Sequence, residues 1–423
     1  MKITNVGIIG LGTVGTGVFK TLQDFKQINI KKIAVKNLSK KRDIPNFDES
    51  LLTTDASQIV NDPEIDIVVE VVGGVNPTFD LLKTAIKNGK HIVTANKELL
   101  AKHGEELFTL AKEKNVVVLY EAAIAGGIPI IMPIKTILAG NKINKISAIL
   151  NGTTNYILTK MDEEGVSYES VLSKAQELGY AETDPTGDVE GYDAAYKIAT
   201  LATIAFNQRV DINKIYREGI TKISAQDMEF AREFGYRIKL IAMAQVQEDN
   251  KVDVRVHPML VSKKLVLAHI NNVTNAVMLT GQPVGDVMFT GPGAGEMPTA
   301  SSVVGDILAL ATEINESNYP LPMMRCHHET KAVHLDINDT YNQYYISISA
   351  TNGHGVIGLV GTLCGNHNIS LASILQKGVK EDNTAEIVVI TEKSKESDVK
   401  AAIEELLKSE SINKINSLIR VMN

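Results

Sequence analysis

The first third of the chain alternates short runs of β-branched and aliphatic residues with longer stretches in which apolar residues recur at helical spacing. Five runs predict buried strands: NVGIIG, IKKIAV, EIDIVVEVV, KHIVTA and NVVVLY. In the stretch VGTGVFKTLQDF the residues Val14, Val18, Leu22 and Phe25 fall on one helical stripe. Because strands and helices alternate, we expect an α/β domain with a doubly wound parallel sheet over residues 1–130, completed by a helix near residues 299–315.

The pattern changes twice further along the chain. Over residues 131–325 longer helical stretches mix with separate strands such as KINKISAIL and KVDVRVHPMLV, which predicts a mixed α+β domain. After a polar join, six runs predict the order β-α-β-β-α-β, a ferredoxin-like module over residues 343–423. These runs are YYISISA, VIGLVGTLCGN, SLASILQ, AEIVVIT, ESDVKAAIEELLK and INSLIRV.

Composition narrows the class of protein. A chain of 423 residues with a hydrophobic share of 44% is typical of a globular protein with two or three domains. No apolar run reaches the roughly 18 residues that cross a bilayer, and no secretory pattern opens the chain, so we expect a cytoplasmic protein without membrane contact. A pI near 5.8 without a long basic tract argues against nucleic acid.

The cysteine content predicts neither a disulfide nor a metal site. Cys326 and Cys364 are far apart in the sequence, which suits a reducing compartment. Cys326 is followed by His327 and His328, but no fourth ligand stands at a spacing suited to a tetrahedral metal site.

A glycine pattern near the start of the chain indicates dinucleotide binding. GIIGLGTVGTG places Gly10, Gly12 and Gly15 in the order G-x-G-x-x-G between a predicted strand and a predicted helix. Such glycines permit a tight turn and let the backbone approach a pyrophosphate, as in Rossmann-type domains; a structural turn is the alternative. The second strand is followed by Lys36 and by no acid until Asp43, which favours the 2′-phosphate of NADP over NAD, unless this is only a solvated loop.

The stretch AQELGYAETDPTGDVEGYDAAYK gathers five carboxylates and ends in a lysine, and its glycines and proline predict repeated turns. Asp193 and Lys197 are four residues apart and therefore share one face of a predicted helix. A lysine beside a carboxylate can donate a proton to a carbonyl oxygen that receives hydride. Glu182 and Asp193 can hold the ammonium of an amino-acid substrate. An ordinary surface helix pair is the alternative.

The same stretch resembles the signature of homoserine dehydrogenase, through G-Y-A-E, D-P, D-V-x-G-x-D and a lysine four residues after the last aspartate. GLGTVG, TANKELLA, YEAAIAGGIPII, ILNGTTNYIL and GPGAGEMPTASSVVGD also resemble family segments, in the family's order, from residue 7 to about 310. The resemblance implies reduction of L-aspartate 4-semialdehyde to L-homoserine with NAD(P)H, in threonine, methionine and isoleucine biosynthesis. Residues 131–325 would then form the substrate-binding and oligomerisation domain.

The resemblance also implies roles for individual residues. Lys197 would be the proton donor and Lys97 a second catalytic lysine, while Glu182 and Asp193 would bind the substrate's amino end with support from Asp188. Implied cofactor contacts are Gly10, Gly12, Thr13, Val14, Gly15, Lys36, Thr94, Lys97, Gly179 and Gly295. A sodium ion is implied at the carboxylate of Glu121 and the backbone carbonyls of Ile124, Gly126 and Ile128, because oxygen ligands suit a hard cation.

Residues 343–423 resemble an ACT domain, the sensor attached to many amino-acid pathway enzymes, which implies a threonine effector. The usual Asp-x-Pro-Gly-Val turn is replaced by residues 352–356, Asn-Gly-His-Gly-Val, so the proline and the leading acid are absent. Pairing of ACT sheets predicts a homodimer or homotetramer. Two alternatives stay open: an amino-acid sensor that keeps a cofactor fold, and an NADP oxidoreductase acting on another amino-acid carbonyl compound.

Overall fold

The computed structural model describes residues 3–45, 47–316, 325–326, 328, 330–379 and 381–423, and His327 lies outside them. Packing divides the chain into two compact units. The first unit contains Met1–Leu150, Ala194–Ile215 and Thr274–Ala332, and the second contains Asn151–Asp193, Tyr216–Val273 and Val333–Asn423. The three domain boundaries expected from the sequence stay a prediction.

A six-stranded parallel sheet forms the centre of the first unit, in the order β3-β2-β1-β4-β5-β6. The chain order reverses between β1 and β4, which is the point where doubly wound sheets bind dinucleotides. The strands are β1 (Thr4–Ile9), β2 (Ile28–Ala34), β3 (Leu52–Thr53), β4 (Ile67–Glu70), β5 (His91–Thr94) and β6 (Val118–Leu119). The predicted doubly wound sheet is confirmed, and the one strand of it that the sequence analysis did not predict is the two-residue β3.

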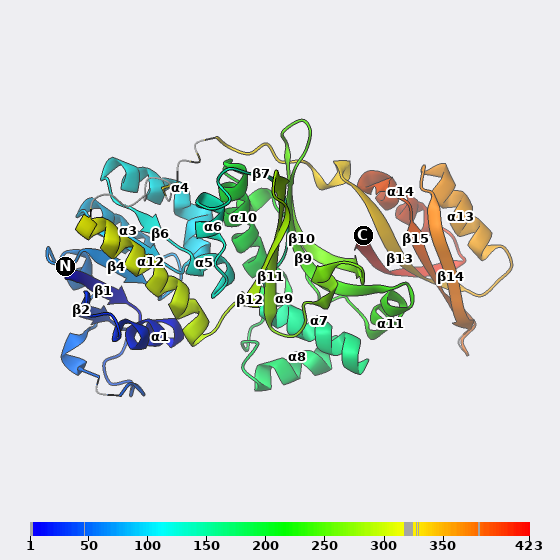
Figure 1. Ribbon diagram of the computed structural model, residues 1–423. Helices are drawn as coiled ribbons and strands as arrows, with labels where there is room; N and C mark the ends of the chain where they lie inside the picture. Colours follow the sequence, from blue (N-terminus) through cyan, green and yellow to red (C-terminus); the bar gives the residue numbers. More distant parts are fainter. Residues whose placement is uncertain (1–2, 46, 317–324, 327, 329, 380) are drawn as a thin grey trace. The chain divides into compact units, whose positions relative to one another are not determined.

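Helices from both ends of the first unit's sequence pack around this sheet. They are α1 (Thr13–Leu22), α2 (Ser57–Val60), α3 (Thr78–Lys87), α4 (Lys97–Glu113), α5 (Ala122–Ala125), α6 (Ile131–Lys135) and α12 (Glu296–Glu316). Figure 1 shows α12 beside α1. A Cβ on Gly17 would lie 2.7 Å from the carbonyl oxygen of Glu296 and 2.9 Å from the Cβ of Ala300, so glycine permits this close approach. Ile8, Val18 and Ile307 consequently share one hydrophobic core.

The first unit also contains three antiparallel strands of the larger sheet and most of helix α10, which carries Lys197. In the sheet, β11 (Thr274–Gln282) pairs with β7 (Lys142–Ile149) on one side and β12 (Gly285–Pro292) on the other. Helix α10 (Tyr192–Phe206) begins in the second unit and continues in the first, followed by η2 (Ile212–Lys214).

The second unit is built on one mixed sheet in the order β9-β10-β17-β13-β15-β14. β9 (Tyr236–Val246) and β10 (Val252–Ser262) form a hairpin, and the free side of β10 pairs in parallel with β17 (Ile412–Met422) over Met259–Val261. The remaining C-terminal elements are β13 (Tyr341–Thr351), α13 (Val356–Asn366), β14 (Leu371–Val379), β15 (Thr384–Thr391), β16 (Ser394–Lys395) and α14 (Glu396–Leu406). The predicted ferredoxin-like module is confirmed, and its sheet continues into the β9-β10 hairpin.

Short helices and strands complete the second unit. They are α7 (Gly152–Glu164), α8 (Tyr168–Glu177), α9 (Thr186–Val189), β8 (Tyr216–Arg217), α11 (Ala225–Glu233), η3 (Val266–His269) and η5 (Ile337–Asp339). The acidic stretch therefore runs through α8, α9 and the start of α10, with turns between them, as its glycines and proline predict. Within the described part of the chain, no helix combines the length and the apolar character that spanning a bilayer demands.

Candidate functional site

The glycine loop between β1 and α1 is shaped by close backbone packing. Gly10 has a φ of +107°, and a Cβ on Gly15 would lie 2.2 Å from the carbonyl oxygen of Gly10. By contrast, no described atom lies within 4 Å of a Cβ built on Gly12, which is the N-cap of α1. Two glycines thus permit the turn and the third leaves the helix start open, with Thr13 and Val14 in the first turn. That arrangement fits a pyrophosphate at a helix N-terminus.

The loop after β2 presents cations to solvent. Lys36 is exposed and follows directly after the buried Val35 at the end of the strand. The guanidinium of Arg42 donates to the backbone carbonyls of Asn37, Leu38 and Lys40, so Arg42 organises the loop. Lys36 therefore stands at the position where a ribose 2′ substituent is read in this fold.

A buried carboxylate joins the carboxyl ends of β4 and β5. The hydroxyl of Thr94 donates to Glu70 at 2.6 Å, and the carboxylate also accepts from the backbone N–H groups of Val72 and Gly73. Burial raises the pKa of the Glu70 carboxyl, although these hydrogen bonds act in the opposite direction. The hydrogen bond to Glu70 therefore fixes the side chain of Thr94. The sequence analysis did not identify Glu70.

Lys97 is the first residue of α4, and its place is set by the residue before it. The Asn96 side chain accepts from the backbone N–H of Leu99 at 3.1 Å, as an N-cap, and donates to the carbonyl of Gly74 at 2.6 Å. Lys97 is half-buried beside this cap. The cap holds the helix start, and with it Lys97, at the carboxyl edge of the parallel sheet.

Lys197 is buried in the second turn of α10, with only 8% of its surface exposed. Its ammonium donates to the carbonyl oxygen of Leu150 at 2.8 Å. Asp193 precedes it by one turn on the same helix and is 7% exposed. A lysine and an aspartate that are both buried need a chemical reason, because such side chains are almost always found in solvent.

Asn151 connects two of the predicted acids in the second unit. Its side-chain nitrogen donates to Asp188 at 2.7 Å and to Asp193 at 3.0 Å. Its side-chain oxygen accepts from the backbone N–H of Thr154 at 2.8 Å and caps α7. The sequence analysis missed this residue, although an Asn directly before a helical stretch in ILNGTTNYIL is an N-cap signal.

Glu182, Gly179 and Gly295, which were also predicted as site residues, are characterised by their exposure and backbone conformation. Glu182 is exposed in the segment between α8 and α9, and no hydrogen bond among the described residues joins its carboxylate to Asp188 or Asp193. Gly179 lies two residues after the end of α8 with a φ of +74° in the second unit, and Gly295 precedes α12 with a φ of +119° in the first. Both glycines hold backbone conformations that other residues rarely adopt.

In the segment expected to bind sodium, the carboxylate of Glu121 is hydrogen-bonded to the backbone. Glu121 is buried, and it accepts from the backbone N–H groups of residues 130–132 at 2.5 to 2.7 Å. Burial raises the pKa of its carboxyl against these hydrogen bonds. The carbonyl of Gly126 accepts from the hydroxyl of Ser302 at 2.7 Å. Among the described residues no group of three or more His, Cys, Asp or Glu side chains could hold a metal ion.

Comparison with known proteins gives one consistent result. Family models for the homoserine dehydrogenase NAD binding domain, homoserine dehydrogenase and the ACT domain match residues 10–121, 129–308 and 344–410. The homoserine dehydrogenase of Synechocystis sp. is 44% identical over 99% of both chains. A homoserine dehydrogenase crystal structure from Thiobacillus denitrificans superposes with a TM-score of 0.92 at 37% identity, covering 100% of this chain and 99% of that one. A hyperthermophilic archaeal homoserine dehydrogenase in complex with NADPH has a TM-score of 0.62 at 27% identity, covering 73% of this chain and 97% of that one.

Proposed function

The chain belongs to the homoserine dehydrogenase family, and we propose that it reduces L-aspartate 4-semialdehyde to L-homoserine with NADPH, with Lys197 as the proton donor. The observation that carries the assignment of Lys197 is a buried lysine one helical turn after a buried aspartate that Asn151 holds beside Asp188. Family membership over the whole chain favours the dehydrogenase over a sensor with an unused cofactor fold and over an enzyme for another carbonyl compound. The product serves threonine, methionine and isoleucine synthesis.

Most of the proposed cofactor contacts belong to the first unit. The nicotinamide cofactor supplies the hydride when bound. Gly10, Gly12 and Gly15 admit its pyrophosphate, with Thr13 and Val14 in the adjoining helical turn. Thr94, Gly179 and Gly295 complete the proposed contacts. The archaeal relative that contains NADPH supports a nicotinamide cofactor, and the lysine-rich loop after β2 supports NADPH over NADH.

The proposed proton transfer follows from how Lys197 is held. Its ammonium has three N–H groups, and the carbonyl of Leu150 accepts from it at 2.8 Å. As the substrate's carbonyl carbon accepts hydride, negative charge develops on the oxygen, and Lys197 gives that oxygen a proton. In the oxidation of homoserine the neutral amine takes the proton back. Lys97, at the start of α4, is proposed as the second lysine that orients substrate and cofactor.

The acids are proposed to hold the substrate's ammonium, which gives the test of the assignment. We expect Asp193→Asn to raise the KM for aspartate semialdehyde about 10- to 100-fold, because a charged hydrogen bond contributes roughly 1.5–3 kcal/mol. Glu182→Gln is expected to raise the same KM. NADPH absorbance measures the rate, and the KM for NADPH is expected to stay unchanged. Asp184→Asn is the matched control, since Asp184 is an exposed acid of the same stretch that bonds its own turn. An equal defect in Asp184→Asn, or a normal KM in Asp193→Asn, contradicts the proposal.

Cofactor choice gives a separate prediction for Lys36. We expect Lys36→Ala to raise the KM for NADPH roughly three- to tenfold and to leave the KM for NADH unchanged, because an exposed charge contact with the 2′-phosphate is partly screened by solvent. Lys26→Ala is the control, because Lys26 is an exposed lysine just before the opposite end of β2. Equal losses with both cofactors would show that Lys36 does not read the phosphate.

The proposed function also includes a bound sodium ion, an amino-acid effector and a homo-oligomer. The sodium ion would be held by the carboxylate of Glu121 and by the backbone carbonyls of Ile124, Gly126 and Ile128. The C-terminal ACT domain is proposed to respond to an amino-acid effector such as threonine. The homodimer or homotetramer and the cytoplasmic location stay predictions.

A further inference from the structure

A cavity of about 520 Å³ lies within the first unit, between the middle of α4 and the second half of α10. Its wall is completed by residues 209–214, by Tyr120 and by His328, Lys331 and Ala332. The volume lies within the range of small-molecule sites, which is roughly 300–1,000 Å³. None of the lining residues is one proposed above to bind cofactor, substrate or sodium, so the cavity has no part in the function described so far.

The charged side chains around this cavity carry an excess of positive charge. Four cations line it against two carboxylates, and these residues are Lys102, Arg209, Lys214, Lys331, Glu105 and Asp211. The chain as a whole has a formal net charge of -7, so the local excess is opposite in sign to the rest of the molecule. Leu100, Phe108, Ile204 and Val210 add apolar surface. A ligand suited to this lining is an anion with an apolar part.

Two of the four cations have carboxylate neighbours, but only one is fully occupied by its neighbour. Lys102 pairs with Glu98 at 2.6 Å and is therefore not assigned to a ligand. The guanidinium of Arg209 donates to the carbonyl of His328 at 3.1 Å, while its Nε lies 3.6 Å from Glu105, which is too far for a hydrogen bond. This Nε is shielded from solvent and has no hydrogen-bond acceptor among the described residues. Since buried donors are nearly always satisfied, Arg209 can still accept an anionic partner.

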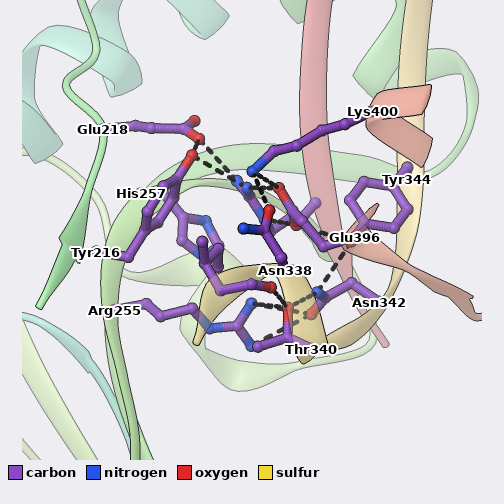
Figure 2. Close-up of polar contacts among 12 residues, drawn as sticks. Tyr216, Glu218, Arg255, His257, Asn338, Thr340, Asn342, Tyr344, Glu396 and Lys400 are labelled. Atoms are coloured by element: carbon purple, nitrogen blue, oxygen red, sulfur yellow. Dashed lines mark hydrogen bonds and ion pairs between the residues drawn. The ribbon is translucent and has the colours of Figure 1, made fainter. Parts of the chain in front are cut away.

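The other two cations have no carboxylate partner. Lys214, at the end of η2, and Lys331 are exposed, and neither ammonium makes a hydrogen bond or ion pair with any residue that the structure describes. The second unit offers a contrast, because its polar groups contact one another. Figure 2 shows Tyr344 and Lys400 at the carboxylate of Glu396. The cavity in the first unit thus has positive charge that the chain itself does not neutralise.

Backbone pairing holds two of these cations side by side. The backbone N–H of Arg209 donates to the carbonyl of Thr330 at 2.7 Å, and the N–H of Ala332 donates to the carbonyl of Arg209 at 2.9 Å. Arg209 and Lys331 are consequently the two partners of a parallel β-bridge. Like charges on directly paired residues of neighbouring strands destabilise the pairing. A bound anion would remove this repulsion.

We propose that this cavity binds a small organic dianion, with its two negative charges toward Arg209, Lys214 and Lys331 and its apolar part against α4 and α10. A phosphate monoester and a dicarboxylate both present this chemistry. A guanidinium binds either group through two parallel hydrogen bonds, and lysines add point charges. The bound molecule would contact both α4, which begins with Lys97, and α10, which carries Lys197.

Calorimetric titration of the full-length enzyme tests the site. The enzyme is saturated with NADPH, so that anions do not enter the glycine loop, and the salt concentration is low, because salt screens exposed charges. The probes are phenyl phosphate and phthalate, which are dianions at about pH 8, and benzoate, which has the same ring and a single charge. We expect at least one dianion to bind, and benzoate to bind roughly tenfold more weakly or worse. Tighter binding of phenyl phosphate would identify a phosphate ligand, and tighter binding of phthalate a dicarboxylate.

Exchange of the exposed lysines locates the binding site. Lys214→Gln and Lys331→Gln are each expected to weaken dianion binding roughly three- to tenfold, because each removes a charge that solvent partly screens. The double variant should weaken binding by more than either single one. Lys114→Gln is the control, because Lys114 is an exposed lysine at the C-cap of α4, outside the cavity. All three lysines are exposed, so these variants are expected to fold like the native chain.

Three results would overturn the proposal. The first is the absence of binding of either dianion to the native enzyme. The second is equal affinity for benzoate and the dianions, since charge would then not select the ligand. The third is native affinity in the double variant, or an equal loss in Lys114→Gln, because the anion would then bind elsewhere. None of these measurements uses turnover, so they are independent of the outcome for the proposed dehydrogenase activity.

Discussion

Replacing Lys197 by alanine is expected to lower kcat by about 10² to 10⁴ while NADPH still binds, because the change removes a proton donor and no phosphate contact. The buried ammonium, held by the Leu150 carbonyl, has no neighbouring lysine on α10 to replace it. Steady-state rates from NADPH absorbance give kcat, and cofactor fluorescence in a titration gives the Kd for NADPH. Lys97→Ala is expected to be severe as well.

Two further variants separate proton transfer from charge and from packing. Lys197→Arg keeps the positive charge but should not restore activity, because a guanidinium does not give up its proton at accessible pH. Lys102→Ala removes an exposed lysine of α4 that pairs with Glu98, and it should leave kcat unchanged. Near-normal kcat in Lys197→Ala would remove the residue from the mechanism, and recovery in Lys197→Arg would assign it an electrostatic role only.

Arg420→Met is expected to lower the free energy of unfolding of the full chain by about 3–5 kcal/mol, because it leaves a buried carboxylate without its cation. Glu396 is fully buried, and Arg420 is its 1%-exposed partner. Burial by itself would raise the pKa of the Glu396 carboxyl, but the hydrogen bond and charge of Arg420 outweigh burial and lower it. The measurement is urea denaturation followed by circular dichroism.

A second cation near Glu396, Lys400, provides the control. Lys400 lies 3.5 Å from Glu396, but its side chain is 38% exposed, so Lys400→Met should cost at most about 1 kcal/mol. The double variant Arg420→Met with Glu396→Leu should recover much of the loss, since it leaves no charge buried at this pair. If Arg420→Met and Lys400→Met lower the free energy of unfolding equally, burial of the Arg420–Glu396 pair does not determine its contribution to stability.

The features that the sequence predicted well are local in the chain. The glycine loop is one of them, because its strand, its turn and its helix all lie between Thr4 and Leu22 and each has its own pattern. The C-terminal module is another, since six consecutive runs each have the periodicity of one element. Asp193 and Lys197 were paired correctly on one helix because helical spacing is itself a sequence property.

Features that depend on distant residues were missed for a physical reason. Asn151 bonds Asp188 and Asp193 across 37 and 42 residues, and no periodic pattern encodes such a contact. Arg420 stands in the strand run INSLIRV, where a charged side chain is expected in solvent, yet the arginine is buried against Glu396. The carboxylate of Glu121 accepts from three backbone N–H groups of residues 130–132, a contact that the sequence analysis did not predict. The residue types in a sequence do not show where backbone N–H donors will lie in the folded chain.

The parallel pairing of β17 with Met259–Val261 also determines how the C-terminal module can be studied. Cutting the chain near residue 340 would remove β17 and leave unpaired backbone N–H and C=O groups at Met259–Val261, among apolar side chains, at a new sheet edge. Exposed edges of this kind recruit other strands and promote aggregation. If a shortened enzyme no longer responds to threonine, aggregation explains the result as well as loss of the sensor does. Single side-chain replacements therefore test the role of the C-terminal module more directly.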